Sequence, residues 1–154
     1  MIHRVVKQLD RMGCGVACAA TVAGITYPEA AAHLLPERWR TMRSGQPVVE
    51  LRPVDLTASG IDVDQLCDLL FVLGFHSPAV VYPGPESPQP WVPAAFAPLH
   101  IACVEAEMGA HYVVWDGDDT YCPSVGQRFR TLRDWSHVWY VVGCEPDAGR
   151  HCSA

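Results

Sequence analysis

The sequence predicts an α+β domain on the basis of three observations. Of its 154 residues, 49% are apolar and 18% are charged, a composition that can bury a core. Helical patterns occupy the N-terminal half, and strand-like segments fill the C-terminal third. We expect one domain over residues 1–143, followed by a loosely ordered tail over residues 144–154.

The first two helices are predicted from small residues and from a capping pattern. Residues 15–23 are small and apolar without proline, which indicates a buried helix that ends at Gly24. Thr26 and Glu29 have the spacing of a capping box, so a second, short helix is expected over residues 28–35. The small side chains of the first helix would let a neighbouring element pack closely against it.

The middle of the chain mixes irregular and regular segments. Residues 38–56 are charged and lack periodicity, which favours a loop. Residues 59–75 carry apolar side chains at spacings of three and four, which predicts an amphipathic helix closed by Gly74. A short strand is expected over residues 79–82. Residues 83–98 contain six prolines and are expected to form a long surface loop, either a lid or an excursion.

The C-terminal third predicts antiparallel strands. They are expected over residues 99–104, 111–115, 120–122 and 138–142. The segment Asp116-Gly117-Asp118-Asp119 has the composition of a turn, so the second and third of these strands should form a hairpin. A helical turn is expected over residues 131–135, before the last strand.

Composition argues against several classes of function. The formal charge is −6 and no basic run is present, so a nucleic acid is not an expected partner. The N-terminus lacks the apolar segment of a secretory signal, and no apolar stretch reaches about 18 residues, so no membrane insertion is expected. Seven cysteines cannot all pair with one another, which favours free thiols in a reducing, cytoplasmic compartment.

The cysteine spacing does not predict a metal site. The closest pair, Cys14 and Cys18, is separated by three residues, and no second pair faces it as zinc sites require. We therefore expect neither a metal nor a cofactor. Most of the cysteines should pack as small buried side chains.

Cys14 is the cysteine whose surroundings favour chemistry. It lies between Gly13 and Gly15 at the expected start of a helix, where the helix dipole favours a thiolate. The glycines would let the backbone turn sharply and let a substrate reach the sulfur. A nucleophilic cysteine needs a base, and His111 begins a strand that would hold an imidazole rigidly. Cys18, one helical turn later, is expected in the core.

These segments resemble the papain-like double-glycine leader peptidases, the cysteine peptidases that process bacteriocins. Gln8 precedes the cysteine by six residues, and Cys14-Gly15-Val16-Ala17-Cys18 matches the family motif position by position. Leu73-Gly74-Phe75 resembles the end of a family helix, and His111-Tyr112-Val113-Val114 resembles its histidine strand. The resemblance covers about residues 5–140.

The resemblance implies a papain-like fold and a peptide or protein substrate. It makes Cys14 the nucleophile, His111 the general base, and Gln8 the side chain that forms an oxyanion hole with the Cys14 backbone N–H. Two positions depart from the family pattern. Gly13 stands where the family commonly has an aspartate, and Cys122 stands, before a proline, where the family has its third catalytic aspartate.

The expected hairpin register places Cys122 close to the histidine. With the turn centred on residues 117–118, Trp115 lies opposite Thr120, and Cys122 lies diagonally from His111, roughly 7–8 Å away at Cα. A thiol orients an imidazole only weakly. The hydroxyl of Ser124, two residues further on, would be a better hydrogen-bond acceptor for the imidazole if the strand extends that far.

Three interpretations of the site remain open. An active enzyme would be a cysteine peptidase or a related thiol acyl hydrolase, such as an isopeptidase or amidase. A degenerate domain would bind a peptide without cleaving it, because the third catalytic carboxylate is missing. In the third interpretation Cys14 and His111 are ordinary core residues. Trp91 and Phe96 of the proline-rich loop are candidate substrate contacts, and the oligomeric state is not predicted.

Overall fold

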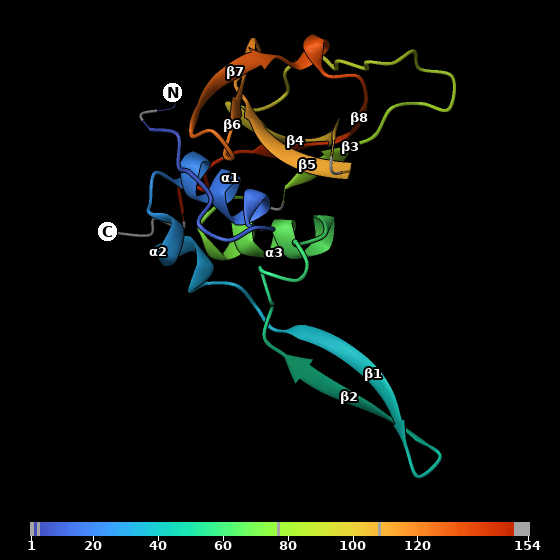
Figure 1. The fold of residues 1–154 in the computed structure, drawn as a ribbon. Coiled ribbons are helices and arrows are strands. Elements are labelled where there is room, and N and C mark those ends of the chain that lie inside the picture. The colour runs from blue at the N-terminus through green and yellow to red at the C-terminus, as the bar shows by residue number, and fades with distance from the viewer. Residues whose placement is uncertain (1, 3, 77, 108, 150–154) are drawn as a thin grey trace.

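A computed structural model describes residues 2, 4–76, 78–107 and 109–149. Its main body has a sheet on one side and a layer of helices on the other, and a hairpin projects away from the helices (Figure 1). This mixture of helix and sheet confirms the predicted α+β class. Among the described residues, no helix is long and apolar enough to cross a membrane.

Within the described residues, three α-helices lie in the segments predicted for them, and the second and third are shorter than expected. Helix α1 spans Cys14–Ala23 and ends at Gly24, whose φ of 70° is left-handed. Helix α2 spans Tyr27–Ala31 behind the predicted capping box, so it ends earlier than expected. Helix α3 spans Val63–Val72 and begins with a second capping box.

The main sheet is antiparallel and has six strands in the order β3-β8-β4-β5-β6-β7. Its strands are β3 Ala79–Val81, β4 Leu99–Ala106, β5 Gly109–Trp115, β6 Asp119–Cys122, β7 Gln127–Thr131 and β8 Val138–Cys144. The predicted helical turn is a 3₁₀ helix over Leu132–Asp134. Strand β7 was not predicted, because all five of its residues are exposed and leave no alternating pattern.

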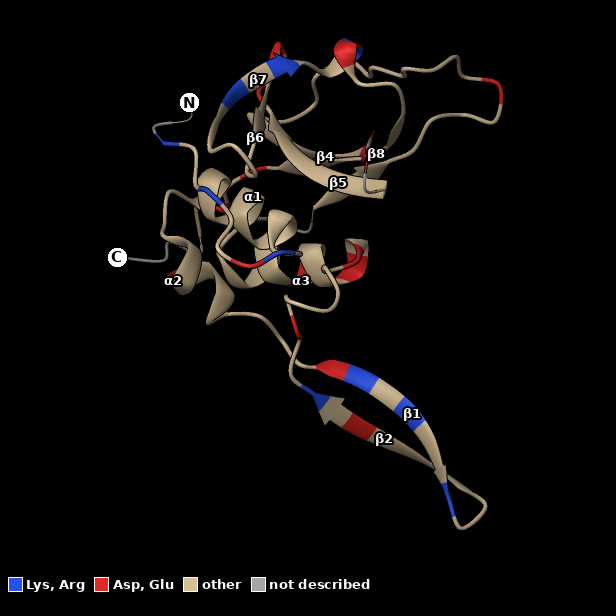
Figure 2. Ribbon diagram, in the orientation of Figure 1, with Lys and Arg blue, Asp and Glu red and all other residues tan. Residues whose placement is uncertain are grey.

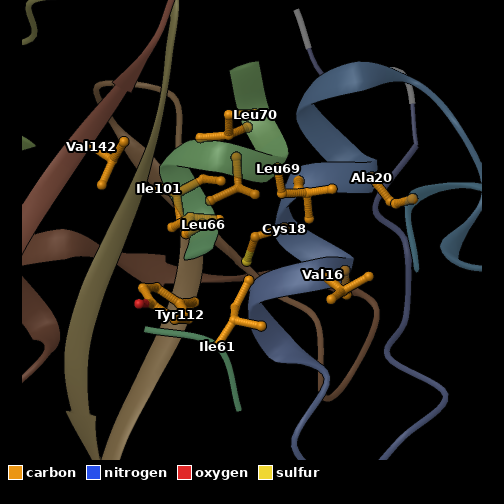
Figure 3. Close-up of a cluster of buried hydrophobic side chains, with 14 of the residues drawn as sticks. Val16, Cys18, Ala20, Ile61, Leu66, Leu69, Leu70, Ile101, Tyr112 and Val142 are labelled. Atoms are coloured by element: carbon orange, nitrogen blue, oxygen red, sulfur yellow. The ribbon is translucent and has the colours of Figure 1, made fainter. Parts of the chain in front are cut away.

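Two hydrophobic clusters lie on the two faces of this sheet. The first packs α1 and α3 against the sheet, and Figure 3 shows Cys18, Leu66 and Ile101 meeting there. The second contains Trp115 and Trp135 on the opposite face. Because successive side chains of a strand point to opposite faces, β5 contributes to both clusters. This strand therefore connects the helix layer to the second core.

The segment predicted to be an irregular loop contains a regular hairpin, and that prediction is wrong. Strand β1, Glu37–Arg43, pairs with β2, Gln46–Arg52, in unbroken register. Ser44 and Gly45 join them with φ values of 51° and 75°, as a two-residue hairpin turn requires. We call residues 37–52 the arm.

The proline-rich segment 83–98 contains neither helix nor strand, as expected, but it is tied to the sheet. The Gln89 side chain accepts a hydrogen bond from the Val138 backbone N–H at 3.0 Å and donates to the Val138 carbonyl at 3.2 Å. Near the other end, the backbone N–H groups of Phe96 and Ala97 donate to Nε2 of His100 at 3.1 and 3.2 Å. The loop is therefore fixed at two points rather than free along its length.

Packing continues beyond residue 143, the expected end of the domain. Strand β8 includes Cys144, and the backbone N–H of His76 donates to the Glu145 carbonyl at 2.8 Å. The Asp147 N–H donates in turn to the Gly74 carbonyl at 2.9 Å. The expected tail thus begins with residues that pack on the body, whereas its Cys152 lies outside the described residues.

Candidate active site

Helix α1 places Cys14 at its first residue, against the strand that carries the histidine. The Cys14 side chain is half-buried, and its sulfur is within reach of the backbone N–H groups of Tyr112, Gly15 and Cys14 itself. Tyr112 directly follows His111 in β5. Cys14 and the Tyr112 backbone, nearly one hundred positions apart in the sequence, are therefore brought together by the packing of α1 on β5.

The histidine is held from the neighbouring strand. Nε2 of His111 lies 3.3 Å from Sγ of Cys122, which is a buried side chain at the end of β6. The Trp135 ring packs beside the imidazole, with a centroid distance of 6.3 Å. The predicted register of this hairpin is confirmed, since Trp115 pairs with Thr120. Cys122 thus contacts the imidazole directly.

The structure does not join the two proposed catalytic groups by a hydrogen bond. Among the described residues, the side-chain partner of His111 is Cys122 rather than Cys14. Because Nε2 faces Cys122, Nδ1 is the ring nitrogen left to take a proton from Cys14. Proton transfer between the two groups would require the sulfur and Nδ1 to come into contact.

Burial shifts both groups toward their neutral forms, in the opposite direction to the thiolate expected from the helix N-terminus. It raises the pKa of the Cys14 thiol, and the N–H donors of Tyr112 and Gly15 offset this only in part. Burial also lowers the pKa of His111. Loss of water around the sulfur is the largest cause of the raised pKa at Cys14, and it favours a thiol beside a neutral imidazole.

Gln8 lies next to the same hairpin but does not present a free amide. Its Nε2 donates to the carbonyls of Asp10 and Arg11 at 3.2 and 3.0 Å, and its Oε1 accepts from the Ser124 hydroxyl at 3.2 Å. Ser124 lies beyond the end of β6 and is bonded to Gln8 rather than to the imidazole. Both N–H groups of the amide are therefore engaged, and a new acceptor would have to displace one of the two carbonyls.

The two glycines beside Cys14 are needed for close packing rather than for a sharp turn. Gly13 has an ordinary φ of −90°, and a Cβ at this position would overlap the hydroxyl of Tyr27. That hydroxyl donates to Asp10 at 2.7 Å. A Cβ on Gly15 would lie 2.7 Å from Ile61. The Tyr27 ring therefore explains why position 13 carries no side chain.

Tyr27 and Trp135 are site neighbours that the sequence did not reveal. Tyr27 follows a helix cap and carries no motif of its own. Trp135 lies more than twenty residues from His111 in the sequence, and only the fold of the sheet brings the rings together. Their roles depend on contacts between distant segments, for which no local pattern exists.

The expected substrate contacts of the proline-rich loop are involved in packing. Trp91 packs against the second hydrophobic cluster, and the Phe96 ring meets the His100 ring edge-on at a centroid distance of 4.8 Å.

Two hollows, of about 690 and 840 Å³, lie away from the candidate site, and neither is lined by Cys14 or His111. Among the described residues, no three His, Cys, Asp or Glu side chains gather as metal ligands.

Comparison with known proteins adds no family to this geometry. A scan of the chain against protein-family models finds no match, and a search of curated proteins finds no matching relative.

Proposed function

We propose that this protein is a papain-like cysteine peptidase or a related thiol acyl hydrolase that acts on a peptide or protein substrate. One observation carries the proposal. Cys14 begins a helix whose terminus lies on the backbone of β5, while the imidazole of His111, one residue away from that contact, is held by Cys122 at 3.3 Å. A core would need neither a cysteine at a helix start nor a histidine whose Nε2 is held by a neighbouring side chain.

The chemistry begins from the neutral pair. With its proton on Nε2, facing Cys122, His111 has a free lone pair on Nδ1. Nδ1 takes the Cys14 proton as the sulfur bonds to the substrate carbonyl carbon, and the carbonyl electron pair moves to oxygen. The Cys14 N–H and a reoriented Gln8 amide stabilise that oxyanion. Collapse expels the amine, which takes the proton from the imidazolium, and water then releases the acyl group.

A second candidate function is a domain that binds a peptide without cleaving it. The contact between His111 and a thiol, in place of a carboxylate, favours this alternative, because a thiol stabilises an imidazolium poorly. The directions of the two pKa shifts favour it as well. The two functions differ in whether a bound peptide or amide substrate is cleaved.

Thiol alkylation of the intact chain tests the proposal. We expect limiting iodoacetamide near neutral pH, mapped by mass spectrometry, to modify Cys14 faster than the half-buried Cys67. Burial and neighbouring carboxylates raise the pKa of Cys67 to about 11, which makes it a slow internal reference. His111→Ala should slow alkylation of Cys14 by roughly 10-fold or more and leave Cys67 unchanged.

Three outcomes separate the candidates. Fast, His111-dependent alkylation together with turnover of amide substrates supports the hydrolase. The same reactivity without turnover, but with peptide binding, supports the non-cleaving domain. Equal rates at Cys14 and Cys67, unaffected by His111→Ala and accompanied by neither turnover nor peptide binding, contradict both and leave the pair as core residues. A Cys67→Ser variant is the matched control, since it removes a thiol on α3 and should change neither the reactivity nor the turnover.

A further inference from the structure

The arm presents an exposed sheet face that belongs to neither hydrophobic cluster of the described residues. Alternation and register place six side chains on this face, all of them exposed: Arg38, Arg40, Met42, Pro47, Val49 and Leu51. The fractional exposures of Met42, Val49 and Leu51 are 68%, 58% and 64%. A two-stranded hairpin is marginally stable in water on its own, so this arm face gains stability when something covers it.

The arm is basic, whereas the rest of the chain is acidic. Four arginines and two glutamates lie within residues 37–52, against 11 basic and 17 acidic residues in the whole chain (Figure 2). Arg43 and Arg52 pair with Glu50. Within the described ranges, Arg38 and Arg40 form no ion pair, so the arm face carries two uncompensated cations beside its apolar side chains.

A hollow of complementary chemistry lies at the base of the arm. It has a volume of about 840 Å³, its apolar lining includes Leu35 and Trp39, and Arg38 and Leu51 at the base of the arm face border it. Helix α3 adds the carboxylates of Asp62, Asp64 and Asp68. In the part of the chain that the structure describes, none of these three aspartates has an ion-pair partner. The hollow therefore suits an element that is both apolar and cationic.

We propose that two copies of this chain dimerise by exchanging arms, each arm face docking in the hollow of the other copy. The arm tip points away from its own body (Figure 1). Arg40 and Met42, nearer the tip than Arg38, do not line the hollow of the same chain. In the second copy they meet Asp64 and Asp68. Because each copy supplies both an arm and a hollow, the contact forms twice around a two-fold axis and closes.

The size of the surfaces favours reciprocal exchange over a single contact. A stable interface buries about 800 Å² per partner and involves about 20–30 residues on each side. One arm face, with six residues, falls short of that number. Engaging the arm face and the hollow of both copies raises the contact to fourteen residues on each side, more than twice that of one arm face, which suits a dimer that depends on concentration. This inference is independent of the chemistry at Cys14.

The oligomeric state of the full chain tests the proposal. Sedimentation and light scattering over a wide concentration range should show a dimer at low salt. The dissociation constant should rise by about tenfold or more at high salt, because exposed ion pairs are screened. A chain that stays monomeric at every protein and salt concentration overturns dimerisation by arm exchange. The arm face would then be a surface for a different, acidic partner.

Charge reversal makes the test specific. The arm variant combines Arg38→Glu with Arg40→Glu, and the hollow variant combines Asp64→Arg with Asp68→Arg. Each should be monomeric alone, because like charges then meet at both contacts. An equimolar mixture should form the heterodimer, because the acidic arm then meets the basic hollow and the basic arm meets the acidic hollow.

Matched controls and opposing outcomes complete the design. Arg133→Glu and Asp118→Arg change exposed residues away from the arm and should leave the dimer intact. Circular dichroism and melting show whether each variant is folded. A hollow variant that still dimerises contradicts arm exchange in favour of arms packed on each other. A mixture that does not form heterodimers also overturns the proposal. An unchanged Cys14 alkylation rate in the monomeric variants separates this result from the proposed hydrolase.

Discussion

The candidate active site and the arm differ in what surrounds them. The strands around His111 are packed on both faces, and the side chains that orient the imidazole come from the same chain. The arm has one face with no cover and contributes no residue to either hydrophobic cluster. Contacts within the chain define the first region, whereas the second acquires a role through contacts with another molecule.

The tight packing of the site predicts the largest effect on stability. Gly13→Ala would force a Cβ into the Tyr27 hydroxyl, so unfolding free energy should fall by about 1–3 kcal/mol, as overpacking does in cores. Chemical denaturation measures the change. Gly84→Ala is the matched control, since its Cβ would meet its nearest neighbour at an ordinary 3.4 Å. Equal stability of both variants would mean that Tyr27 moves away at little cost.

A carboxylate beside the imidazole should raise the reactivity of the Cys14 thiol. Cys122→Asp would place a negative charge next to Nε2 of His111, which raises the pKa of the imidazole and favours proton transfer from Cys14. We expect alkylation of Cys14 to become about tenfold faster near pH 6.5. Cys122→Asn, which orients the ring without a charge, should give a smaller increase. Unfolding of both variants would show that position 122 tolerates only an apolar side chain.

Acidification should weaken the body through its buried histidines. Nε2 of His100 accepts two backbone N–H bonds, and Nδ1 donates to the Trp115 carbonyl, so the ring is neutral, and burial lowers its pKa. In the unfolded chain the His100 imidazole takes up a proton near pH 6.5, whereas in the folded chain it does so only at lower pH. The unfolding free energy therefore falls as pH drops below about 6.5, by at most about 1.4 kcal/mol per pH unit for one group. His111 adds to the slope with the same sign.

Urea unfolding between about pH 7 and pH 5 measures this slope. His100→Gln should lower the unfolding free energy at neutral pH. It should also make that free energy depend less on pH, because the titrating imidazole is gone. His33→Gln, at an exposed position, should leave the slope as it is. A slope that is unchanged in the His100 variant would assign the effect to other groups.

Removal of the arm should have the smallest effect on the body. Replacing residues 37–52 by a short Gly–Ser linker deletes no core residue, and the described side-chain hydrogen bond between arm and body is that from Gln65 to Glu37, at 3.1 Å. We expect the unfolding free energy to change by less than about 1 kcal/mol and the Cys14 alkylation rate to stay the same. Loss of folding on removal would contradict the separation of the two regions.

Sequence patterns predicted the site's framework better than its chemistry. The start of α1 and the hairpin register around Cys122 follow from a glycine, a turn and strict alternation, all of which are local signals. The protonation state of Cys14 was not predictable, because it depends on burial by β5, far away in the sequence. Likewise, nothing near Gly13 shows that Tyr27 fills the space beside it.

The arm was missed for a related reason. Its strands carry charged and apolar residues on both faces, so the alternation that normally reveals a strand is absent. Ser44-Gly45 was the one local signal, since such a dipeptide marks a turn. A hairpin whose apolar face is not buried in its own chain leaves little trace in the sequence.

The Gln89 side chain has a further consequence for the edge of the sheet. Strand β3 pairs with β8 over residues 141–143, so Val138 lies beyond the end of that partner. There the Gln89 side-chain amide forms hydrogen bonds with both the N–H and the carbonyl of Val138, as the backbone of a neighbouring strand would. A free edge invites another molecule to add a strand, which is a common route to aggregation. A side-chain amide ends the hydrogen-bonding pattern, because it offers no backbone of its own for a further chain to extend.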